Sequence, residues 1–157
     1  MYSIDRKDKV VELNNIPQSS VGAPIPVVLA DEHLTIVTYY IQEDVDDEEA
    51  TAIVSFKRCL AFMFGPPNDE AFRGHPLSSR GLRPYSSFII ENSSWIRELE
   101  KMNSVHPYHS HKLFEDYRHF ILSFHDSTFE CIAEDYEYEI LKGKISDAID
   151  RMKDKLR

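Results

Sequence analysis

Five of the seven histidines lie in one stretch of the chain, between His106 and His125. The same stretch holds Ser123 and is followed by Cys131, the best candidates for a reactive serine and a reactive cysteine. Imidazole changes its charge near neutral pH, transfers protons and binds metal ions, so chemistry is expected here first. No motif in the stretch matches a known catalytic pattern, so the placement of these residues on the predicted strands decides what they can do.

Residues 118–125 and 128–134 form the clearest predicted hairpin, with Asp126 and Ser127 as its turn. A two-residue turn places His125 opposite Thr128 and His119 opposite Glu134. In that register one face is entirely apolar and is expected to face the core; it consists of Phe120, Leu122, Phe124, Phe129, Cys131 and Ala133. The other face carries Ser123, His125 and Glu130 as neighbours.

The candidate catalytic residues on this second face are Ser123, His125, Asp126 and Glu130. A histidine beside a hydroxyl and a carboxylate can support general acid–base or nucleophilic chemistry. Side chains two residues apart on a strand stand about 7 Å apart, however, and the sequence contains no nucleophile elbow. A polar strand face that is solvated or covered by a helix is the alternative interpretation of the same residues.

The histidines before the hairpin, His106, His109 and His111, have the compact spacing H-x-x-H-x-H. Two of them could share an ion, but the spacing matches no zinc-finger or metalloprotease pattern. His119 and His125 lie about 20 Å apart on an extended strand and cannot share one. We therefore predict no metal and no cofactor, and the three loop histidines are the candidates should an ion bind.

A long loop rich in glycine and proline, residues 65–84, separates two predicted strands. A loop of this length in a compact domain is functional or is ordered by its own contacts. Its candidate binding residues are Asn68, Asp69, Glu70 and His75. In an enzyme we would expect this loop to close over His125, Asp126 and Glu130.

The order of elements predicts an α+β fold, because strands come first and helices later without regular alternation. A mainly antiparallel sheet of about six to eight strands is expected, with the remaining strands at residues 26–30, 33–41, 52–56, 59–64 and 85–90. A turn at Asp31 and Glu32 would place Leu29 opposite Leu34. Residues 52–56 and 59–64 are apolar on both faces and are expected to be central strands.

Two helices are expected, a central one at about residues 94–102 and a C-terminal one at about residues 144–156. In the first, Trp95, Leu99 and Met102 recur on one face and predict a buried stripe around the only tryptophan. Residues 1–25 are polar and end in a proline-rich segment. We expect them to form an arm laid over a single domain of residues 26–157.

The chain of 157 residues has 18 basic and 27 acidic residues, a net charge of −9. This charge argues against nucleic acid and membrane as partners, because both favour lysine and arginine. It permits a basic protein partner. The N-terminus contains no apolar signal-peptide region, and the longest apolar run is too short to cross a bilayer. Cys59 and Cys131 lie in apolar runs and are expected to be buried thiols, so the sequence predicts a cytoplasmic protein.

Several strings between about residues 60 and 135 are specific enough to serve as a family label. They are FGPPNDEA at 64–71, GHPL at 74–77, ENSSWI at 91–96, NSVHP at 103–107 and RHFILSFHDSTFECIA at 118–133. Together they resemble a family of small bacterial proteins to which no activity is assigned. The resemblance implies a bacterial source and a single domain, and it implies no catalytic residue.

These features favour a non-enzymatic, protein-binding domain of the interaction or immunity type. The alternative is a hydrolase or acid–base enzyme with a site at His125, Asp126 and Glu130 under the 65–84 loop. The enzyme requires His125 and Glu130 to line a concave pocket closed by that loop. A flat, open hairpin face would favour an interaction surface there, and a face packed beneath a helix would favour neither.

Overall fold

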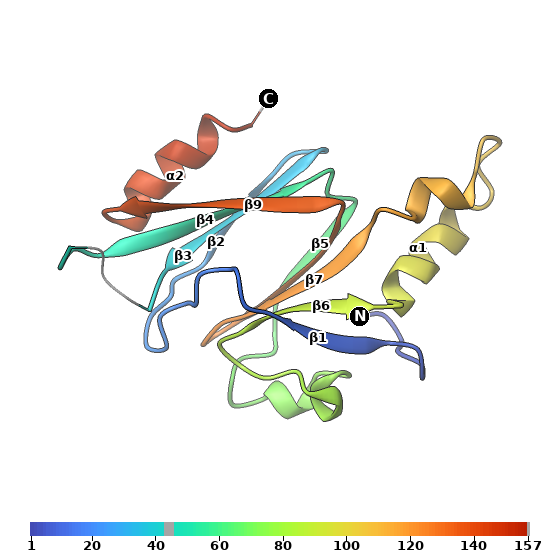
Figure 1. Ribbon diagram of the computed structural model, residues 1–157, viewed down its shortest axis with the longest axis horizontal. Helices are drawn as coiled ribbons and strands as arrows, with labels where there is room; N and C mark the ends of the chain where they lie inside the picture. The colour runs from blue at the N-terminus through green and yellow to red at the C-terminus, as the bar shows by residue number, and fades with distance from the viewer. Residues whose placement is uncertain (43–45, 157) are drawn as a thin grey trace.

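The computed structural model describes residues 1–42 and 46–156, which form two antiparallel sheets and two helices (Figure 1). The five-stranded sheet has the order β1-β6-β7-β8-β5, and the four-stranded sheet has the order β2-β3-β4-β9. The strands are β1 (Lys9–Leu13), β2 (Val27–Ala30), β3 (Leu34–Tyr40), β4 (Ala50–Lys57), β5 (Ala61–Gly65), β6 (Ser87–Glu91), β7 (Arg118–Ser123), β8 (Thr128–Ala133) and β9 (Asp135–Lys142). The α+β prediction is confirmed, but two sheets replace the expected sheet of six to eight strands.

The two sheets pack face to face, and the outer face of each is covered. Between the sheets lies an aromatic core in which Phe56 of β4 contacts Phe120 of β7 and Phe129 of β8. Helix α2 (Ile145–Lys153) covers the four-stranded sheet through Ala148 and Met152. Helix α1 (Ser94–Asn103), the 65–84 loop and the N-terminal residues cover the other sheet. The hairpin face that carries Glu130 is therefore an interior face.

The β7–β8 hairpin keeps its predicted faces but not its predicted register. Ser123 lies opposite Thr128, and His119 lies opposite Ile132. The shift of two residues arises because the turn is longer than expected and is closed by a 2.8 Å hydrogen bond from Phe124 N–H to the Ser127 carbonyl. A shift of two leaves each side chain on its face and changes each partner across the ladder. The predicted pairing of His119 with Glu134 is wrong for this reason.

Strand β5 lies at the edge of the five-stranded sheet, whereas the sequence predicted a central strand (Figure 1). Its side chains Phe62 and Phe64 are 45% and 43% exposed. The other predicted central strand, β4, does lie inside its sheet, between β3 and β9. An apolar run on both faces identified a strand in each case, but it did not distinguish an edge from a centre.

The remaining elements differ from expectation at their ends. Residues 9–13 of the predicted arm form β1, which pairs with β6. Helix α1 begins after Ser93, whose side chain accepts a hydrogen bond from Ile96 N–H, and its buried stripe stops before Met102, which is 70% exposed. In the first hairpin Leu29 lies opposite Ile36, so the predicted pairing with Leu34 is wrong.

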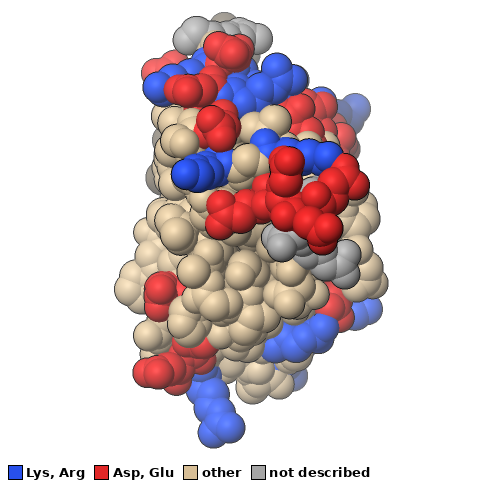
Figure 2. Space-filling model, turned by 90° about the vertical axis from the view of Figure 1, so that its left-hand side faces the viewer, with Lys and Arg blue, Asp and Glu red and all other residues tan. Residues whose placement is uncertain are grey.

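Charge is unevenly spread over the surface. Figure 2 shows acidic side chains interspersed with lysine and arginine in the upper part of one face and, below them, a broad area with few charged side chains. The loop between β1 and β2 runs along that side of the molecule in Figure 1, and residues 13–30 include no charged residue. The described residues contain no helix long and apolar enough to cross a membrane.

Candidate functional site

Glu130 lies at the centre of a buried cluster of polar side chains. The residue is 2% exposed, and its carboxylate accepts hydrogen bonds from the Tyr2 hydroxyl at 2.7 Å, from His119 Nε2 at 2.8 Å and from His75 Nε2 at 2.8 Å. The donors come from the N-terminal arm, strand β7 and the 65–84 loop. One carboxylate on β8 therefore joins three separate segments of the chain.

Hydrogen bonds fix the proton on one histidine of this cluster. Leu77 N–H donates to His75 Nδ1 at 3.1 Å, so Nδ1 carries no proton and His75 is neutral, with its proton on Nε2. His119 Nδ1 lies 2.8 Å from the Ser93 hydroxyl, which can either donate or accept. Only His119 can therefore carry a second proton without losing a hydrogen bond.

The two histidines set the ionisation of Glu130. Burial alone would raise the pKa of this carboxyl, but the hydrogen bonds from His119 and His75 outweigh it and lower the pKa to about 2. Burial, followed by the nearby Glu130 charge, raises the pKa of Tyr2, so the phenol stays protonated and donates. The cluster is a hydrogen-bond network around one carboxylate in the interior, closed to solvent.

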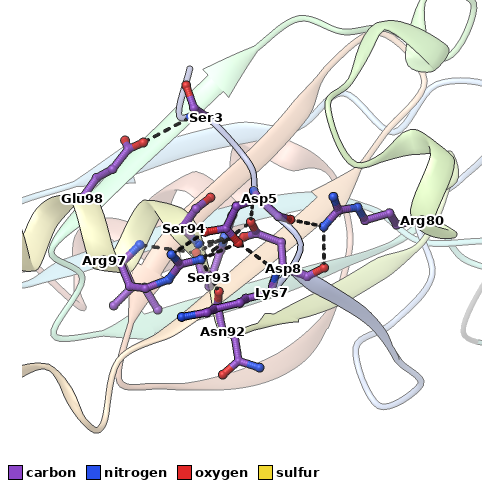
Figure 3. A network of polar contacts seen from close by, with 12 residues as sticks. Ser3, Asp5, Lys7, Asp8, Arg80, Asn92, Ser93, Ser94, Arg97 and Glu98 are labelled. Carbon is purple, nitrogen blue, oxygen red and sulfur yellow. Dashed lines mark hydrogen bonds and ion pairs between the residues drawn. The ribbon is translucent and has the colours of Figure 1, made fainter.

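Residues 1–8, which precede β1 and are called the arm from here on, cover this cluster through a second polar network (Figure 3). Asp8 accepts a 2.7 Å hydrogen bond from Ser94 N–H at the start of α1, where the helix dipole favours a carboxylate. Arg97 donates two hydrogen bonds to Asp5, at 2.6 and 2.9 Å, and Arg80 donates to the Asp5 and Asp8 carbonyls. The arm is thereby attached to both α1 and the 65–84 loop.

A different cluster forms where the 65–84 loop meets the β7–β8 turn. His125 Nδ1 lies 2.9 Å from Asp69 Oδ2, and Tyr85 donates to the same oxygen. A carboxylate only accepts, so His125 carries its proton on Nδ1 and leaves Nε2 unprotonated when neutral. The Tyr85 hydrogen bond, helped by His125, lowers the pKa of Asp69, and the bond to Asp69 raises the pKa of Tyr85 to about 12.

This second cluster borders an open cavity of about 530 Å³. The cavity is lined by Asp69, Phe72, Arg73, Ser78, Ser79, Leu82, Arg83 and Pro84. The His125 side chain is 38% exposed and that of Asp69 20%. An aspartate that orients a partly exposed histidine can support proton transfer.

The structure divides the predicted catalytic residues between the two clusters. His125 contacts Asp69 and Tyr85, whereas Glu130 is buried with His75 and His119. Ser123 donates to the Arg83 and Ser86 carbonyls and accepts from Ser86 N–H, so its hydroxyl holds the loop and does not contact His125. Asp126 is exposed at the turn.

The predicted binding residues are also divided. His75 is buried against Glu130, and Asp69 contacts His125. Asn68 accepts a hydrogen bond from Ala71 N–H at 2.9 Å and thereby holds its own turn, while Glu70 is exposed. The 65–84 loop does lie over the hairpin, but it reaches His125 and Glu130 through different residues.

The loop histidines and the cysteines take simpler roles. His111 and His109 lie 2.7 and 3.7 Å from Glu100, and the first contact raises the pKa of His111. Within residues 1–42 and 46–156, no group of three His, Cys, Asp or Glu side chains is placed to hold a metal ion. Cys59 and Cys131 are buried free thiols, as predicted.

Tyr2, Ser93 and Tyr85 are the members of these clusters that sequence reasoning missed. Tyr2 is the only aromatic residue in an otherwise polar N-terminal stretch, which is the one signal that pointed to an anchor. Ser93 caps helix α1, and its bond to His119 joins residues 26 positions apart. Contacts of this range follow from the fold and leave no local pattern.

No protein-family model, curated protein or solved structure matches this chain. The resemblance of residues 60–135 to a family of small bacterial proteins stays a prediction.

Proposed function

We propose that this protein binds an extended segment of another protein along the free edge of β5. The observation that carries the proposal is an edge strand with two exposed phenylalanines and no charge. Phe62 and Phe64 are nearly half exposed, and residues 59–67 include no charged residue. An edge strand presents unpaired N–H and C=O groups, which a partner strand can pair with.

The other three sheet edges are better protected. Strand β1 carries Lys9 and Glu12, and β9 alternates charged with apolar residues from Asp135 to Lys142. Charged side chains on an edge oppose strand addition. Strand β2 lacks charge, but all four of its residues are half-buried. β5 is therefore the edge that offers both an open strand and apolar side chains.

The surroundings of β5 favour a partner with a particular charge. Beyond Gly65, at the C-terminal end of the strand, follow the acidic residues Asp69 and Glu70, and Asp69 N–H donates to the carbonyl of His125, next to Asp126. We expect a partner segment with alternating apolar side chains and a basic residue at this end. This partner agrees with the excess of acidic residues in the chain.

The test uses a displayed library of random ten-residue linear peptides selected on the full chain. Selected peptides should perturb the amide resonances of residues 61–65. The variant Phe62→Lys/Phe64→Lys should bind them at least 30-fold more weakly, because it adds charge at the edge and removes both aromatic rings.

The matched control is Val105→Lys/Tyr108→Lys, since these side chains are 89% and 84% exposed and lie outside both sheets. It should bind the peptides like the unaltered chain. Equal affinity of the β5 variant and the unaltered chain would exclude the edge as the binding site.

A second candidate function is acid–base hydrolysis at His125, and one observation favours it. Asp69, which lines an open cavity, orients the partly exposed imidazole through Nδ1 and leaves Nε2 unprotonated when the ring is neutral. If this dyad is catalytic, His125→Asn should slow hydrolysis of a panel of p-nitrophenyl esters by about 100-fold or more. His111→Asn, which removes a more exposed histidine, is the control. Equal rates for the unaltered chain and His125→Asn would eliminate this candidate.

A further inference from the structure

The side chain of Tyr2 occupies a site whose three sides each match one part of a phenol. Its ring stacks on Trp95 with centroids 5.5 Å apart and planes at 9°. The His119 ring packs against it in a T-shaped arrangement, with ring centroids 5.1 Å apart and planes at 85°. Its hydroxyl donates to Glu130 at 2.7 Å. A stacking platform, an aromatic wall and a buried acceptor together recognise an aromatic ring that bears a hydroxyl.

The buried Glu130 carboxylate at the base of this site is not what stability alone would favour. A buried carboxylate carries a desolvation cost, and apolar residues in its place are often at least as stable. Here the carboxylate is held by two histidines, and the third donor is the phenol itself. The phenol thus supplies a hydrogen bond that Glu130 otherwise lacks.

The segment that brings Tyr2 to the site can leave without disturbing either sheet. Tyr2 lies between the exposed residues Met1 and Ser3, before the first strand β1. Residues 1–7 are held at the surface by the Asp5–Arg97 ion pair, by the Arg80 bond to the Asp5 carbonyl and by the Ser3 N–H bond to Glu98 (Figure 3). The buried bond from Ser94 N–H to Asp8 need not break when these residues leave. Exposed contacts of this kind each contribute little to stability.

We infer that the pocket formed by Trp95, His119 and Glu130 is a binding site for a phenolic ring, and that Tyr2 is its internal occupant. The site is separate from β5 and does not depend on the protein-binding proposal. A phenolic ligand competes with the arm, so binding and arm release are coupled.

The test vacates the pocket with Tyr2→Ala and adds p-cresol. Trp95 is the only tryptophan, so its fluorescence reports the pocket directly. We expect a saturable change with a Kd on the order of 1 mM, and toluene, which lacks the hydroxyl, should bind at least tenfold more weakly. Tyr108→Ala, which removes an exposed tyrosine and keeps Tyr2 in the pocket, should respond only at much higher p-cresol concentrations, like the unaltered chain. A folded Tyr2→Ala variant without a saturable response overturns the inference.

If Tyr2→Ala does not fold, amide hydrogen exchange of the unaltered chain tests the same inference. Excess p-cresol should speed amide hydrogen exchange at Asp5 and Lys7 at least threefold and leave Phe129 unchanged. No acceleration in the arm would then overturn the inference.

The phenol can belong to a small molecule or to a tyrosine near the start of another chain. A peptide with the sequence of residues 1–8 separates these sources. Binding to Tyr2→Ala at least tenfold tighter than p-cresol assigns the site to a tyrosine-bearing chain end, and equal or weaker binding assigns it to a small phenol.

Discussion

Replacing Glu130 with alanine is expected to destabilise the protein by about 3–5 kcal/mol, the usual cost of removing one partner from a buried ionic network. Three donors, from Tyr2, His75 and His119, would lose their acceptor in an interior that water does not reach. The free energy of unfolding from urea titrations measures this loss. Glu130→Gln should cost less, because its amide oxygen still accepts from His75 while its NH₂ group faces His119. A loss below 1 kcal/mol for Glu130→Ala would contradict the buried network.

The free energy of unfolding should also depend on pH through the Glu130 carboxylate. The pKa of Glu130 is lowered from its ordinary value of 4.5 to about 2 in the folded protein. A lowered pKa contributes stability that is present above pH 4.5 and is lost as the pH falls from there towards 2. The lowering of the Glu130 pKa from 4.5 to about 2 corresponds to about 3 kcal/mol of folding stability. Between pH 6 and pH 3, the unaltered chain should therefore lose more stability than Glu130→Gln, and parallel losses would contradict this.

Phe129→Ala is expected to destabilise the protein by about 3–5 kcal/mol, whereas Phe62→Ala should cost about 1 kcal/mol or less. The two rings stack on each other with their centroids 6.2 Å apart, so they are direct neighbours. Phe129 is fully buried and also contacts Phe56 of the other sheet, whereas Phe62 is 45% exposed on the edge strand. The pair is a matched comparison of a core position and an edge position.

Urea unfolding of the two variants checks this directly. Equal, large losses would mean that β5 is a covered strand, as the sequence alone predicted, and that the protein-binding surface proposed here does not exist. A small loss for Phe129→Ala would contradict the face-to-face packing of the two sheets.

Local patterns predicted the faces of the strands and the positions of both helices. The alternation from Phe120 to Ala133 assigned each side chain to its correct face, because that assignment depends only on the two-residue period. Turn length is not contained in that period, so the partners across both hairpins were shifted by two residues. Strand β9 was missed, although Tyr136, Tyr138 and Ile140 alternate with acidic residues.

The candidate sites were predicted less well, because they depend on contacts between distant segments. His75 meets Glu130 across 55 residues and Tyr2 meets it across 128. The sequence placed His125 and Glu130 on one strand face, but His125 lies in the turn beyond β7, and the 65–84 loop gives each residue a different partner. The edge position of β5 is set by strand order, which its own residues do not encode.

Cross-strand NOEs between the α-protons of β5 and a bound peptide would show directly whether a partner strand adds to this edge. We expect such contacts along residues 61–65, together with protection of the outward β5 amides from hydrogen exchange. Peptides that contact Asp69, Tyr85 and His125 but give no NOEs to β5 would contradict this expectation.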